Sequence, residues 1–297
     1  MPVIELKDVS KLYGFGNATT VALDEVTLKI EPGEFVAVMG PSGSGKSTLM
    51  NMIGLLDRPT YGDYKLGGKL VSRMGGSRQA RARRDTVGFV FQFFNLLPHL
   101  TVIDNVSLPL IYKGKTKTRR LKHAGRVLER VGLSDREYFY PYQLSGGQLQ
   151  RAAIARALVN EPKIIIADEP TGNLDSASSR VVMELLSEIH QTGSTILMVT
   201  HNPELTRYAS RIVFMRDGAI VSDEQSVIGE LPETIRKRSY FVRKKTMAED
   251  VQGVSALMKA VPDAATKSDK KPTKPKPKTR SRSYSSTGRK RRKKASS

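Results

Sequence analysis

A glycine-rich loop at residues 40–48 has the residue types and the spacing of a phosphate-binding site. Glycines let the backbone turn tightly, so that successive N–H groups and a helix N-terminus can point at phosphate oxygens. Lys46 adds a cation for the β- and γ-phosphates of a nucleotide, and the Ser47 hydroxyl is a ligand that Mg²⁺ accepts. The pattern G-x-x-x-x-G-K-[ST] is complete, and we expect nucleotide contacts from all its residues: Gly40, Pro41, Ser42, Gly43, Ser44, Gly45, Lys46, Ser47 and Thr48.

A pair of carboxylates follows Lys163 and the aliphatic residues 164–167. In parallel sheets the carboxyl end of a strand faces the ligand, so Asp168 is placed to hold Mg²⁺ and Glu169 to accept a proton from an attacking water. A second apolar run, residues 195–199, leads through Thr200 to His201, which is placed to hydrogen-bond the γ-phosphate. Taken alone, the polar residues after either apolar run could simply begin a loop. The complete phosphate loop in the same chain favours the catalytic interpretation.

Three further sites are informative only together with the motifs described above. Gln92 follows an apolar run at 87–91, where its amide could reach a metal or an attacking water. Tyr13 lies upstream of the phosphate loop, where its ring could stack on an adenine or pack beside a turn. Ser145, Gly146, Gly147 and Gln148 open a helical run, and this serine cap with glycines predicts a second anion site at a helix N-terminus.

The elements that position these residues are predicted from periodicity. Alternating apolar residues over 3–9 and 21–30 indicate half-buried antiparallel strands, and residues 61–91 add further strands and a basic helix at 73–84. Residues from about 93 to 162 are mostly helical, with a threonine cap at Thr101. The continuous aliphatic runs are typical of buried parallel strands. We therefore expect an α/β fold with a phosphate-loop core, a mainly parallel sheet, an N-terminal antiparallel subdomain and an inserted helical subdomain.

Composition limits the class of protein. The chain has 297 residues, 39% of them hydrophobic, which is enough for a sizeable core, and it has no cysteine for disulfides or thiolate metal sites. No apolar run reaches the ~18–20 residues of a membrane-spanning helix, and residues 1–8 lack the features of a signal peptide. We accordingly expect a protein of the cytosol unless a partner holds it at a membrane.

The charge of +20 is concentrated at one end of the chain. Residues 233–297 carry 21 Lys and Arg against 5 Asp and Glu, which leaves +4 for residues 1–232. We predict that the globular part ends at 232, that 233–262 is a partly helical extension, and that 263–297 is a disordered tail rich in Lys, Arg, Pro and Ser. Such a tail is expected to bind polyanions, with anionic lipid as the first choice and nucleic acid as the second.

The order of these motifs over about residues 1–225 resembles that of an ABC-transporter ATP-binding subunit. Leu-Ser-Gly-Gly-Gln at 144–148 beside a phosphate loop and a strand ending in Asp-Glu is a highly specific combination. The closest resemblance is to the macrolide-exporter, lipoprotein-release and cell-division ATPases. That narrower match is carried by residues 54–60, 94–98, 105–110 and 167–175.

The resemblance implies ATP and Mg²⁺ as cofactors, with Tyr13 stacking on adenine, Gln92 on the metal and Glu169 as general base. It further implies that Asp175 lies in a loop that crosses a dimer interface, and that Ser145 and its glycines act on the partner's nucleotide. With one phosphate loop per chain, two chains must face head to tail to complete two sites. The expected partner is an integral-membrane permease, which would keep the subunit on the cytoplasmic face of the cell membrane.

Two rival functions stay open on the sequence. One is a soluble ABC ATPase that acts on nucleic acid or ribosomes through the basic tail, although such proteins usually have two ATPase units or a coiled-coil insertion. The other is a cell-envelope ATPase whose permease transmits force and moves no substrate. The sequence does not separate this second rival from export.

Overall fold

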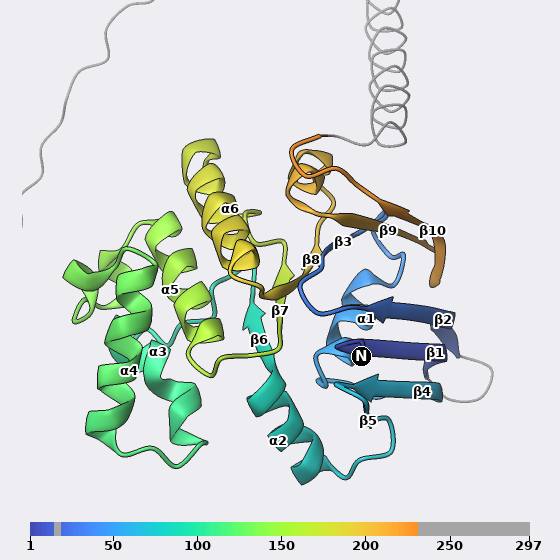
Figure 1. The fold of residues 1–297 in the computed structure, drawn as a ribbon, viewed down its shortest axis with the longest axis horizontal. Coiled ribbons are helices and arrows are strands. Elements are labelled where there is room, and N and C mark those ends of the chain that lie inside the picture. The colour runs from blue at the N-terminus through green and yellow to red at the C-terminus, as the bar shows by residue number, and fades with distance from the viewer. Residues whose placement is uncertain (15–18, 231–297) are drawn as a thin grey trace, which may run out of the picture. The chain divides into compact units, whose positions relative to one another are not determined.

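The phosphate loop belongs to a six-stranded sheet in the order β10-β9-β3-β8-β7-β6 (Figure 1). The structure is a computed structural model, and it describes residues 1–14 and 19–230 of the chain. The predicted domain end at 232, the extension at 233–262 and the tail at 263–297 lie outside these residues. The strands are β3 (Phe35–Met39), β6 (Val87–Val90), β7 (Ile164–Asp168), β8 (Thr195–Val199), β9 (Arg211–Arg216) and β10 (Ala219–Gln225).

Five of these strands run parallel, and β10 closes the sheet by pairing antiparallel with β9. The sheet is buried on both faces, as the unbroken aliphatic runs predict. In β3, Phe35 and Ala37 pack into one apolar core while Val36 and Val38 pack into the other. Since successive side chains of a strand point to opposite faces, each core needs only every second residue.

The antiparallel subdomain predicted at the N-terminus is a second sheet in the order β2-β1-β4-β5. It contains β1 (Ile4–Tyr13), β2 (Thr20–Ile30), β4 (Tyr61–Leu66) and β5 (Lys69–Leu70). Its apolar face shares a core with helix α1 (Lys46–Ile53), which follows the phosphate loop. The buried Tyr64 hydroxyl donates to the Ile53 carbonyl at 2.6 Å, so the second sheet fixes the C-terminal end of this helix.

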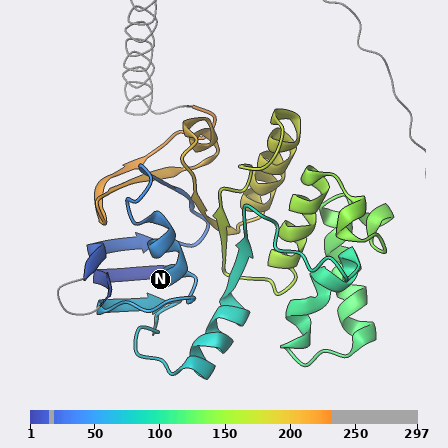
Figure 2. The same cartoon turned by 180° about the vertical axis from the view of Figure 1, so that it is seen from behind.

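The other helices flank the six-stranded sheet, and those within residues 102–158 lie on the side away from the antiparallel sheet (Figure 2). They are α2 (Gly76–Thr86), α3 (Val102–Ile111), α4 (Lys117–Arg130), α5 (Gly146–Leu158) and α6 (Ser176–Gln191). Thr101 caps α3 as predicted, accepting from the Asp104 N–H. The basic helix begins at Gly76, three residues later than predicted, because Gly75 ahead of it is extended. The predicted α/β architecture is confirmed.

No helix within residues 1–14 and 19–230 has the length and apolar character needed to span a membrane.

Candidate functional site

The glycines of the phosphate loop lie where a side chain would be obstructed or strained. Gly40 (φ 153°) and Gly45 (φ 93°) pass so close to other strands that an added Cβ would lie 2.2 Å from the Met215 carbonyl oxygen and 2.5 Å from that of Ala22, respectively. Gly43 has φ 80° with nothing near it, so only its backbone conformation requires glycine. Gly45 is also the N-cap of α1, and the loop therefore presents its N–H groups together with a helix N-terminus.

Lys46 lies across the loop that it follows. Its Nζ donates to the carbonyl oxygens of Gly40 at 2.9 Å and Pro41 at 2.7 Å. Burial lowers the pKa of Lys46, and the nearby carboxylates of Glu169 and Asp168 oppose that shift. The Lys46 ammonium group is therefore close both to the loop backbone and to the two carboxylates. A phosphate group bound by the loop would need a cation at this position.

Asp168 and Glu169 lie at the carboxyl end of β7, next to that ammonium group. Burial raises the pKa of Asp168, with Glu169 adding to the shift and Lys46 opposing it. Glu169 has φ 44°, a left-handed conformation that is unfavourable for a residue other than glycine. Its N–H donates to the Val199 carbonyl at 2.9 Å, so the neighbouring strand holds this conformation in place. Backbone strain of this kind gathers at functional sites.

The Glu169 carboxylate is held by residues that follow β8. Its Oε1 accepts from the His201 N–H at 2.9 Å and lies 2.7 Å from His201 Nδ1, and its Oε2 accepts from the Thr200 hydroxyl at 3.1 Å. Against an ionised carboxylate, Nδ1 must carry the proton. The His201 side chain is 73% exposed and Glu169 only 16%, so the imidazole presents its Nε2 edge outward.

The oxygen ligands near the loop can hold Mg²⁺ only together with phosphate oxygens of a bound nucleotide. No cluster of three His, Cys, Asp or Glu that could hold a metal occurs among the residues that the structure describes. The exposed Ser47 hydroxyl and the Asp168 carboxylate remain as oxygen ligands. Because Mg²⁺ prefers six oxygens and takes many of them from phosphates and water, two protein ligands are sufficient beside ATP.

Gln92 turns toward the loop that follows β7. Its Nε2 donates to Asn173 Oδ1 at 3.4 Å, and Asn173 Nδ2 donates back to the Gln92 carbonyl at 3.0 Å. The same amide lies 2.7 Å from where a Cβ of Gly172 would be. Asp175, farther along that loop, caps α6 and accepts from the Ser178 N–H at 2.9 Å and from its hydroxyl at 2.7 Å. These bonds lower the pKa of the exposed Asp175.

The Ser-Gly-Gly segment forms the capped N-terminus of α5. Ser145 Oγ accepts from the Gln148 N–H at 3.3 Å and the Gln148 side chain accepts from the Ser145 N–H at 2.9 Å, which is a capping box. Gly147 packs on Ser178, where an added Cβ would lie 3.0 Å from its side chain. No hydrogen bond or ion pair in the described part of the chain joins residues 145–148 to the phosphate loop. The two anion sites predicted from the sequence are therefore not joined within one chain.

Tyr13, at the end of β1, is anchored by an aspartate that sequence reasoning missed. Its hydroxyl donates to Asp57 Oδ2 at 2.7 Å, while Lys11 pairs with Asp57 Oδ1 at 2.6 Å and lies 4.9 Å from the centre of the Tyr13 ring. Burial and then the bond to Asp57 raise the pKa of Tyr13. Tyr13 is 44% exposed, and the bond to Asp57 fixes the orientation of its ring.

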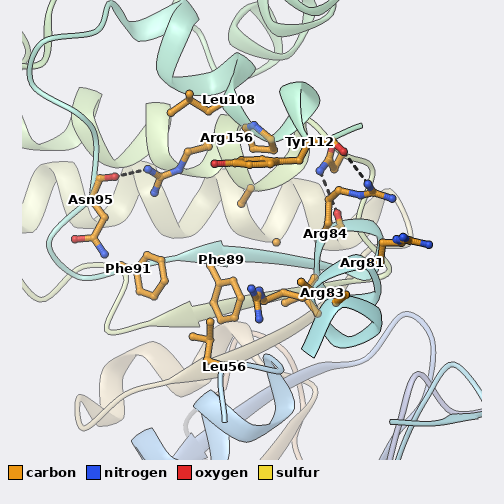
Figure 3. A pocket seen from close by; sticks show the side chains of 17 residues that line it. Leu56, Arg81, Arg83, Arg84, Phe89, Phe91, Asn95, Leu108, Tyr112 and Arg156 are labelled. Carbon is orange, nitrogen blue, oxygen red and sulfur yellow. Dashed lines mark hydrogen bonds between the residues drawn. The ribbon is translucent and has the colours of Figure 1, made fainter. Parts of the chain in front are cut away.

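A groove of about 880 Å³ lies between α2, β6, α3 and α5 (Figure 3). Its wall includes Phe89, Phe91, Leu56 and Tyr112, and Arg156 from α5 crosses it to the loop after Gln92. Arg156 donates to the carbonyl oxygens of Phe94, at 2.8 Å, and Asn95, two successive left-handed residues. Sequence reasoning gave Arg156 no role, because the two carbonyls that it binds leave no signal in side-chain patterns.

The family model of the ABC transporter matches residues 23–172. An uncharacterised ABC transporter ATP-binding protein of Methanocaldococcus jannaschii is 55% identical over 219 residues, which is 74% of this chain and 98% of that protein. The macrolide export ATP-binding/permease protein MacB of Hyphomonas neptunium is 48% identical over 235 residues, 78% of this chain but only 36% of MacB.

A solved structure with the same fold is the ATP-binding cassette MJ0796, a dimer in a post-hydrolysis state bound to ADP and Pi. It has a TM-score of 0.69 and 44% identity, and the match covers 75% of this chain and 98% of that one. The loop, the carboxylate pair, the Ser-Gly-Gly cap and these matches agree with one another. The chain therefore belongs to the ABC transporter family, in which it is an ATP-binding subunit and an ATPase.

Proposed function

We propose that two copies of this chain bind MgATP head to tail and separate after hydrolysis, driving a separately encoded membrane permease of the macrolide or lipoprotein export type. The observation that carries the proposal is that no hydrogen bond or ion pair links the two anion sites within the described part of one chain. The phosphate loop and the Glu169 carboxylate meet at the carboxyl end of the sheet, whereas Ser145 caps a helix that has no hydrogen bond to them. Each copy thus supplies half of two sites, and the dimer of the related MJ0796 supports this arrangement.

Within a composite site, the loop N–H groups and Lys46 hold the phosphates, and the Ser145 cap of the partner subunit completes the shell around the γ-phosphate. Ser47 and Asp168 hold Mg²⁺, which neutralises phosphate charge when bound. Glu169 accepts the proton of the attacking water, because Oε2 keeps a free lone pair beside its bond to Thr200. His201 is oriented by Glu169 and turns its exposed Nε2 edge toward the γ-phosphate.

Gln92 and Asp175 connect this chemistry to other parts of the molecule. We assign Gln92 to the metal side of the site. Its bond to Asn173 ties it to the segment leading to Asp175, and Asn95, three residues later, lines the groove. That segment is mostly exposed, and its Leu174 side chain packs against the start of α5. A Cβ added to Gly146 would lie 3.1 Å from Leu174 Cδ2. We therefore place Asp175 in the loop that meets the partner subunit.

The permease docks in the groove of Figure 3. The groove combines apolar side chains of β6 and α3 with the loop that starts at Gln92, so occupancy by a helical segment would press directly on that loop. MacB carries an ATP-binding part and a permease part in one chain, and this chain spans about a third of it. For this chain we propose that the permease part is a separate polypeptide.

The test is size-exclusion chromatography of Glu169→Gln with MgATP. Glutamine keeps the shape and hydrogen-bonding reach of Glu169 but cannot take a proton, so ATP stays bound and the dimer accumulates. The control is Glu169→Gln/Ser145→Arg, in which a bulky cation fills the position of the cap. The proposal predicts a dimer for the first protein and a monomer that still binds ATP for the second. A Glu169→Gln protein that binds ATP and stays monomeric at high concentration contradicts it.

A further inference from the structure

Positive charge in the described part of the chain is concentrated in residues 73–130, some of which line the groove. Residues 73–130 carry 13 Lys and Arg against 3 Asp and Glu, a net charge of +10, whereas residues 1–72 and 131–230 together carry −6. This separation exceeds what a near-neutral ATPase surface needs for solubility, for which mixed charges suffice. The excess lies in α2, in α4 and in the segment that joins α3 to α4.

Helix α2 and the segment that joins α3 to α4 lie side by side although they are distant in sequence. Arg84, near the end of α2, donates to the Tyr112 carbonyl at 2.7 Å. The hydrogen bond from Arg84 holds the pKa of Asp85 below its ordinary value, and the charges of Lys113 and Arg81 add to that effect. A single acid thus lies among three cations, and the patch keeps a positive excess. We call this surface the basic rim; it consists of Arg78, Arg81, Arg84, Lys113, Lys115 and Lys117.

An apolar tip adjoins the basic rim. Ile111 is 45% exposed and Tyr112 is 74% exposed, and both come directly before Lys113. Tyr112 also forms one end of the groove, where Figure 3 places it near Arg84 and Arg81. A tyrosine and an aliphatic side chain surrounded by lysines and arginines are typical of protein surfaces that enter the headgroup region of a bilayer.

We propose that the basic rim binds the anionic phospholipid surface of the membrane in which the permease lies. The proposal rests on docking of the permease in the groove, because a permease held there brings the adjoining rim next to the headgroups. Lipid phosphates attract each cation of the rim, and the attraction falls off within a Debye length of ~8 Å at physiological salt. Ile111 and Tyr112 favour a bilayer over an acidic protein segment, since an acidic segment would leave both side chains in water.

The experiment measures binding of the full chain to vesicles without any permease. Vesicles of phosphatidylcholine and phosphatidylglycerol in a 3:1 ratio are compared with vesicles of phosphatidylcholine alone. The rim variant is Arg81→Glu/Lys115→Glu/Lys117→Glu, three exposed side chains with no hydrogen bond or ion pair in the described structure. Its control, Lys7→Glu/Lys69→Glu/Arg216→Glu, changes three exposed cations of other elements. Both variants have the same net charge and keep residues 231–297 unaltered.

The rim variant is expected to lose about tenfold or more in apparent affinity for the anionic vesicles, and the control to lose less than about threefold. Equal losses in both variants would show that net charge or residues 231–297 determine the binding, and would overturn the proposal. Unchanged binding of the rim variant would also overturn it and point to an acidic protein segment as the partner of the rim. MgATP binding by both variants reports correct folding. Because the dimerisation test uses no lipid, failure here is distinguishable from failure of the head-to-tail mechanism.

Discussion

Removing the Tyr13 ring tests whether this side chain is the adenine platform. Stacking of a base on an aromatic side chain contributes roughly 1–3 kcal/mol, and 1.4 kcal/mol corresponds to tenfold in affinity. Tyr13→Ala should therefore weaken ATP binding by about 5- to 150-fold. The assay is equilibrium titration with a fluorescent ATP analogue labelled on the ribose, with displacement by unlabelled ATP. A Tyr13→Ala protein that binds ATP like the parent refutes the stacking assignment.

The hydroxyl adds a second, smaller effect that the sequence does not predict. On sequence grounds Tyr13→Phe should bind like the parent, because the ring remains. In the structure the hydroxyl bond to Asp57 fixes the ring, and immobilising a freed side chain on binding costs about 0.5–1.5 kcal/mol. We expect about 2- to 12-fold weaker binding for Tyr13→Phe and for Asp57→Ala, with no further loss when the two are combined. Additive losses would show that Asp57 acts independently of Tyr13.

The same contact predicts how binding depends on pH. The pKa of Tyr13 is raised above 10.0, and the pKa of Asp57 is lowered below 3.8 because the bonds from Lys11, Tyr13 and Arg58 outweigh the opposing effect of burial. The anchor is lost only as pH falls through the lowered pKa of Asp57 or rises through the raised pKa of Tyr13. The ratio of Tyr13→Phe to parent affinity should thus be constant from about pH 6 to 9, and a titration within that window would contradict this account.

Three further predictions concern the loop and the groove. Lys46→Ala should abolish ATP binding without changing the temperature of thermal unfolding, because it removes the cation that we assign to the phosphates. ATP binding retained in calorimetry would contradict this. Gly45→Ala should destabilise the protein by at least about 2 kcal/mol in urea unfolding, and more than Gly33→Ala, whose glycine has positive φ but open space around it. Arg156→Met should loosen the loop after Gln92. A Phe93→Trp reporter, unique in a chain without tryptophan, should then lose fluorescence anisotropy; unchanged anisotropy counts against the clamp.

Much of the site was predictable because its chemistry is local in sequence. The phosphate loop, the Asp-Glu pair and the Ser145 cap each depend on consecutive residues, whose backbone geometry follows from glycine, capping and strand periodicity. The two sheets followed from the contrast between unbroken and alternating apolar runs, as β7 and β1 illustrate. In each case short-range steric and hydrogen-bonding preferences agree with the final fold.

The residues that escaped prediction act over long sequence distances. Asp57 reaches Tyr13 across 44 positions, and Arg156 reaches Phe94 across 62. Neither contact leaves a periodic signal, because each depends on where separate elements pack. The basic rim is similar, since α2 and the segment before α4 become neighbours only in the folded protein. The contact between His201 and Glu169 was likewise not expected from the sequence.

The head-to-tail site is the central claim, and a disulfide between chains tests it most directly. The chain has no cysteine, so Ser42→Cys in the phosphate loop and Ser145→Cys in the cap of α5 can each be introduced alone into the Glu169→Gln protein. Both serines are exposed. With MgATP and a mild oxidant, we predict that a mixture of the two variants forms a covalent dimer, and that neither variant does so alone. Cross-linking of the Ser145→Cys variant to itself, or no ATP-dependent cross-link in the mixture, would contradict the account.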